Sequence, residues 1–132
     1  MATGLRAHAA GLLCVVAAVE LLIGHAVWLR RAEFVDRFVR VQADPALVGQ
    51  TALAWVDWRA VVAALDADRL PCSGSERQLL RIAASLAEGV PVDLGGALTS
   101  FDRVNLGLVA AAVLAVGAHH EGAAELAEVT GR

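Results

Sequence analysis

The sequence predicts an all-α fold, a single-domain bundle of about five helices around two strongly apolar helices, residues 5–29 and 100–117. The hydrophobic fraction is 58%, above the ~45–50% that is typical of soluble domains. Apolar residues recur at helical spacing in several segments, and no segment shows a convincing strand alternation. The 132 residues suit one domain. We expect residues 1–118 to form that domain and residues 119–132 to form a small acidic tail.

The first predicted helix contains GLLCVVAAVELLIGHAVWLRR, residues 11–31, in which Glu20 and His25 interrupt an apolar run. On a helical wheel, one broad face gathers aliphatic side chains, and Trp28 falls on the opposite face. The helix is expected to end near Leu29, because a further turn would place Arg30 in the apolar face. The aliphatic face consists of Leu5, Leu12, Val15, Val16, Val19, Leu22, Ile23 and Val27.

Two other interpretations of this stretch are a membrane anchor and a signal peptide. An anchor would place Glu20 near the centre of the bilayer, at a cost of a few kcal/mol. A signal peptide would have only a short apolar run, Leu12 to Val19, because Glu20 follows it directly. The pattern therefore favours a helix in the core of a soluble domain.

The next segments alternate between short helices and loops. Residues 31–41 form an amphipathic pattern with a Glu33–Arg37 pair at i,i+4. Pro45 and Gly49 interrupt residues 42–54, which we interpret as a loop. The predicted helix face of residues 31–41 consists of Phe34, Val35, Phe38, Val39 and Val41.

Two further helices have clear start signals. Asp57 is a good N-cap for a helix over residues 58–66, and Val56 and Val61 have the spacing of a hydrophobic staple. Ser73 and Glu76 have the Ser-x-x-Glu spacing of a capping box, which predicts a helix over residues 73–87. Gly89 is the expected stop for that helix.

Ser100 is the expected N-cap of the last helix, 100–117, and Asp102 suits the first turn. Beyond Asn105 this helix is apolar on all sides. Such a helix is buried all round, either within the domain or in an oligomer. The residues after 118 are small and acidic, which is typical of a frayed tail.

Charge and cysteine content exclude several classes of function. The net charge is −3, so no overall positive field draws the chain to nucleic acid or anionic lipid. Cys14 and Cys72 are too few for a disulfide framework and lack zinc-site spacing. A reducing, cytoplasmic location is therefore expected.

No group of residues predicts catalysis, a metal site or a cofactor. His119, His120 and Glu121 are metal-ligand types, but neighbours on a helix point ~100° apart. Cys72 precedes a helix N-terminus, which can activate a thiol, yet no base lies near it in sequence. The sequence therefore leans against an enzyme, with no catalytic residue, metal ligand or cofactor to name.

The candidate partner-binding residues are Trp55, Trp58, Arg77 and Arg81. The tryptophans could anchor a partner or pack the start of the 58–66 helix. The arginines lie on the polar face of the 73–87 helix, which with the 58–66 helix loosely suggests a helix-turn-helix. The link between those helices is longer than usual and contains proline.

Three stretches, ELLIGHAVWLRRAEFVDRFV, LPCSGSERQLLRIAASLAEGVPVDL and ALTSFDRVNLGLVAAAVL, resemble a group of small, all-helical actinobacterial proteins without an assigned activity. The resemblance covers most of residues 17–118. It implies a soluble helical domain and brings no activity, cofactor or catalytic residue.

The sequence therefore leads to three functional hypotheses. The first is a soluble helical protein that acts through protein–protein contact, with a partner protein or a second copy. The second is a helix-turn-helix-like DNA-binding regulator, and the third is a small protein anchored to a membrane by its N-terminal segment. No substrate or small-molecule ligand can be named.

Overall fold

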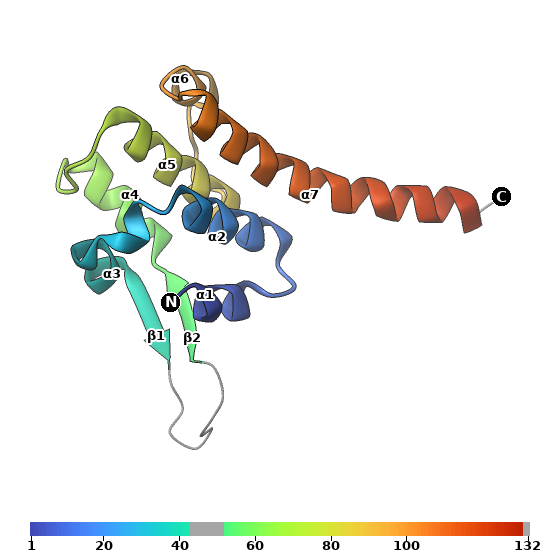
Figure 1. Cartoon of the computed structure of the whole chain (residues 1–132), viewed down its shortest axis with the longest axis horizontal. Coiled ribbons are helices and arrows are strands. Elements are labelled where there is room, and N and C mark those ends of the chain that lie inside the picture. The colour runs from blue at the N-terminus through green and yellow to red at the C-terminus, as the bar shows by residue number, and fades with distance from the viewer. Residues whose placement is uncertain (43–51, 131–132) are drawn as a thin grey trace.

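The computed structural model describes residues 1–42 and 52–130, with side chains for 1–42 and 52–117. The fold is mostly helical, as the predicted all-α class requires. It is not strictly all-α, because it also includes a small two-stranded sheet. The elements in chain order (Figure 1) are α1 (Ala2–Ala9), α2 (Leu13–His25), the 3-10 turn η1 (Trp28–Arg30), α3 (Ala32–Phe38), β1 (Val39–Gln42), β2 (Leu53–Val56), α4 (Trp58–Asp66), α5 (Gly74–Glu88), α6 (Leu94–Leu98) and α7 (Arg103–Thr130).

The prediction of one helix over residues 5–29 is wrong, because the structure has two separate helices there, α1 and α2, followed by the turn η1. Gly11 has φ +86, in the left-handed region that glycine adopts most readily. α2 then stops at Ala26, which has φ 66 and donates its N–H to the carbonyl of Leu22. The two helices are joined again at the surface, where Arg6 donates to both carboxylate oxygens of Glu20 at 2.7 and 3.1 Å.

α2 lies at the centre of the fold, between α1, α5 and α7 (Figure 1). Its buried residues are small or aliphatic, and five of them have relative exposures of 4% or less: Ala17, Ala18, Val19, Leu21 and Leu22.

The helical wheel misplaced Trp28, which is fully buried. The 3-10 turn that follows α2 redirects its indole into the core, where Nε1 donates to the carbonyl of Glu76 at 3.3 Å. Arg31 covers the same indole from outside, with its guanidinium carbon 4.5 Å from the ring centroid.

The two strands pair antiparallel, with Val39 opposite Val56 and Gln42 opposite Leu53. The predicted 31–41 helix is therefore too long, because its last residues belong to β1, where only Val39 faces the core. The Glu33–Arg37 pair within α3 is confirmed at 3.3 Å. Most of the predicted 42–54 loop, residues 43–51, lies outside the described residues. Its last two residues, 53 and 54, belong to β2.

Three predicted helix ends are confirmed. The Asp57 carboxylate accepts the N–H of Ala60 at 3.1 Å and begins α4. Ser73 and Glu76 form the reciprocal capping box of α5. Gly89 ends α5 in the left-handed conformation, with φ 69.

α7 begins later and runs further than predicted. Asp102, and not Ser100, caps it, because the Asp102 carboxylate accepts the N–H of Asn105 at 2.8 Å. The Ser100 hydroxyl instead donates to the carbonyl of Ala97. The helical backbone continues through residue 118, the predicted end of the domain, to Thr130. Figure 1 shows it projecting away from the other helices.

Candidate functional site

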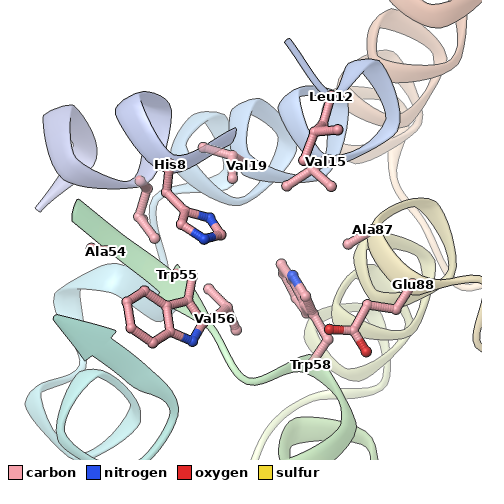
Figure 2. A pocket seen from close by; sticks show the side chains of 11 residues that line it. His8, Leu12, Val15, Val19, Ala54, Trp55, Val56, Trp58, Ala87 and Glu88 are labelled. Carbon is pink, nitrogen blue, oxygen red and sulfur yellow. The ribbon is translucent and has the colours of Figure 1, made fainter. Parts of the chain in front are cut away.

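A pocket opens where α1, α2, β2, α4 and the end of α5 meet (Figure 2). Its volume is about 110 Å³. The walls are mainly aliphatic, with two indoles, one imidazole and one carboxylate. The side chains that line it are Leu5, His8, Leu12, Val15, Val19, Ala54, Trp55, Val56, Trp58, Ala87 and Glu88.

The strand-to-helix junction around Asp57 positions both tryptophans in this pocket. Trp55 lies on β2 and is partly exposed, and its ring stacks on His8 with centroids 5.3 Å apart and planes 29° apart. Trp58 begins α4 and has a relative exposure of 3%. In Figure 2 the Trp58 ring points toward Val15, and the His8 ring points down over Trp55.

The acidic group of the pocket is Glu88, the last residue of α5. Its carboxylate lies 3.3 Å from the Nε of Arg59, which is 75% exposed. An exposed pair of this kind contributes little to stability, because water screens it. The carboxylate is therefore available at the pocket and shared with one solvated guanidinium.

A second surface is formed by α7, which rests on α2 along a narrow seam. Within its described side chains, only Val109 and Ala112 are buried. The prediction of a helix buried on all sides is therefore wrong within this domain. A groove of about 190 Å³ follows one side of the seam and is lined by Leu13, Val16, Ala17, Glu20, Leu21, Leu108, Ala111, Ala112 and Ala115.

Arg77 and Arg81 lie apart from the tryptophans, on the first half of α5. Arg81 is paired with Asp66, the last residue of α4, at 2.8 Å, and Arg77 is paired with Asp68, two residues further along the chain, at 3.0 Å. The Asp68 carboxylate raises the pKa of Arg77 above its ordinary value. Both guanidinium groups are thus engaged by carboxylates on the surface of the domain. The four predicted partner-binding residues thus do not form one site.

The other candidates for chemistry do not assemble into a centre. Cys14 is exposed and Cys72 is half-buried, and both are free thiols. Among the described residues, no three His, Cys, Asp or Glu side chains come close enough to hold a metal ion. The side chains of His119 and His120 lie outside the described ones. Of the described helices, none has the length and apolar character needed to cross a lipid bilayer.

Sequence reasoning missed His8 and Glu88. His8 reaches Trp55 only because α1 turns back across β2, which follows from the break at Gly11. Glu88 is a polar residue at the end of an amphipathic helix, and nothing in its local sequence separates it from a solvated surface acid. Its role in the pocket depends on how α4 and α5 pack.

No family model, no curated protein and no solved structure matches this chain.

Proposed function

We propose that this protein is an interaction module that associates with a second copy of itself through the outer face of α7. That face consists of Leu106, Ala110, Val113, Leu114 and Gly117 and follows helical spacing. The observation that carries the proposal is the exposure of its large apolar side chains. Leu106 is 39% exposed, Val113 54% and Leu114 68%.

An exposed row of aliphatic side chains on a helix favours association. Burial of apolar surface is favourable by roughly 25 cal/mol per Å², and monomeric proteins rarely leave large contiguous apolar patches in water. Ala110 lies between the larger side chains and Gly117 follows them, and both allow a partner helix to approach closely. The same helix is held in place from behind by Val109 and Ala112, which pack on α2.

Charge and register favour a second copy in antiparallel orientation as the occupant. Arg103 and the glutamate at position 121 are separated in the sequence by about five helical turns. Each is nine residues from Ala112. In an antiparallel pair of α7 helices centred at the level of Ala112, this spacing sets position 103 of each copy opposite position 121 of the other.

The experiment is sedimentation equilibrium over a concentration series, on the wild type and on two variants with matched glutamate substitutions. We expect the wild type to show a concentration-dependent dimer, and Val113→Glu combined with Leu114→Glu to shift the chain to monomer. The control is Val41→Glu combined with Leu94→Glu, because those side chains are 58% and 50% exposed but lie outside α7. A wild type that stays monomeric at millimolar concentration, or a control as disruptive as the α7 variant, contradicts the proposal.

We also propose a cytoplasmic location. The support is the pair of free thiols, since an oxidising compartment favours disulfides and exposed free cysteines are uncommon there. Fractionation of the expressing cell, with an antibody against the chain, tests this location directly. Recovery from washed membranes only with detergent would contradict it and would favour the membrane-anchor alternative.

A further inference from the structure

We propose that the pocket between α1, α2, β2, α4 and α5 binds a small organic cation, an alkylated ammonium group. This proposal is independent of association through α7, because no residue of α7 lines the pocket.

The size and the walls of the pocket fit an alkylated ammonium group. The volume of about 110 Å³ suits a group of a few carbon atoms. Val15, Val19 and Val56 supply aliphatic contacts that would remove its methyl groups from water. A strongly hydrated ion without alkyl groups would gain little from these walls.

The two indoles supply the attraction for positive charge. A cation over the face of a tryptophan is drawn to the negative face of the ring, and tryptophan is the strongest of the aromatic residues in this respect. Trp58 also lines the pocket and has a relative exposure of 3%, so a ligand would contact a small, desolvated part of its ring. Desolvation strengthens such contacts compared with exposed sites. Trp55 lines the pocket as well, with its ring stacked on His8 (Figure 2).

The charge at the pocket mouth has the matching sign. Glu88 is the one acidic side chain among the lining residues. Its carboxylate is now paired with Arg59 at 3.3 Å. Because the Arg59 side chain is 75% exposed, this ion pair is weak and another cation can replace Arg59. A ligand ammonium would add to or replace this weak pair.

The test compares choline with its neutral isostere 3,3-dimethylbutan-1-ol. Binding is followed by the three indole N–H signals in ¹H–¹⁵N spectra, recorded at one fixed pH so that no titration of the protein contributes to the shifts. We expect Trp55 and Trp58 to shift with choline, and the neutral alcohol to bind about tenfold more weakly. Trp28 is an internal control, since it is fully buried and bonded to the Glu76 carbonyl outside the pocket.

Two surface variants separate the cation from a merely apolar ligand. Glu88→Gln should weaken choline binding several-fold, and Arg59→Gln should strengthen it, because it removes the competing cation. Both residues are exposed, so the fold should persist, and an unchanged Trp28 signal verifies this. Equal binding of choline and the alcohol, no binding of choline, or weaker binding to Arg59→Gln would each overturn the proposal.

Discussion

At the scale of single residues, the burial of His25 should make the stability of the protein depend on pH. It is the last residue of α2 and is half-buried, and its buried Nδ1 has no hydrogen-bond partner among the described residues. Burial lowers the pKa of His25 below its ordinary value of 6.5, although the nearby carboxylates of Glu76 and Asp102 oppose the shift. The folded state thus prefers the neutral imidazole.

The sign of the pH dependence follows from that preference. Because the unfolded chain binds a proton at His25 more readily than the folded one, stability is complete above about pH 6.5 and falls as the pH drops through the lowered folded pKa. We expect the melting temperature to fall between about pH 7 and pH 5.5, and His25→Leu to remove part of that fall. An identical slope in the variant would contradict the role of His25.

Two glutamates affect stability over a separate, lower range of pH. The Arg6 guanidinium holds the pKa of Glu20 below its ordinary value of 4.5. The Ser73 backbone N–H does the same for Glu76. Their contributions are present above pH 4.5 and are lost below it. Loss of these carboxylate contributions is therefore separate from the change expected for His25, because it occurs at lower pH.

At the scale of elements, the contact between α1 and β2 depends on Gly4. A Cβ at this position would lie 2.7 Å from the backbone oxygen of Ala52 and 3.2 Å from the Cβ of Ala54. Neither atom belongs to a flexible side chain, so α1 and β2 would have to move apart.

We therefore expect Gly4→Ala to lower the free energy of unfolding by about 1–3 kcal/mol, the usual range for overpacking. Chemical denaturation measures it. Gly74→Ala is the matched control, because Gly74 is also near the start of a helix and a Cβ there meets nothing within 4 Å. An equal or higher stability of Gly4→Ala would show that the two elements are not in close contact.

The helix ends show how much of the fold could be predicted from the sequence. The caps at Asp57, Ser73 and Gly89 were predictable, because each depends on residues a few positions apart. The hairpin was not, because its strands are four residues each and pair across the 43–51 segment. Short strands acquire their identity from pairing partners rather than from local pattern. Val39 and Val41 also fit a helix face, which led to the overlong 31–41 helix.

The break between α1 and α2 was equally hidden. The apolar pattern continues through Gly11, and an isolated glycine does not by itself end a helix. The fold back of α1 is supported by non-local contacts, including Arg6 with Glu20 and His8 with Trp55. The pocket could be predicted only in part for the same reason. Trp55 and Trp58 were recognisable as candidates, but their association with His8 and Glu88 required the folded arrangement.

At the scale of the whole molecule, the proposed antiparallel dimer has a specific charge requirement. Arg103→Glu would place two acids opposite one another at each end of the paired helices, and Glu121→Arg would place two bases there. We expect each single variant to weaken dimerisation, and the double variant to restore it, because the pairs re-form with reversed sign. Like-charge repulsion is screened by salt, so the effect of the single variants should shrink above about 0.5 M salt.

Sedimentation of the four proteins at one concentration checks this expectation. A double variant no better than the sum of the single variants would exclude the antiparallel register, while leaving an apolar contact through Val113 and Leu114 intact. The outcome therefore distinguishes the geometry of the dimer from its existence.

The position of the pocket has a mechanical consequence for folding. Its walls come from five elements that extend along the chain from Leu5 to Glu88. A ligand bound there would contact α1, β2 and the central helix α2 at the same time and would hold them together. It would suppress partial detachment of α1 as well as global unfolding, by about 2.7 kcal/mol when present at one hundred times its dissociation constant. The site would thus couple occupancy to the lifetime of the native state.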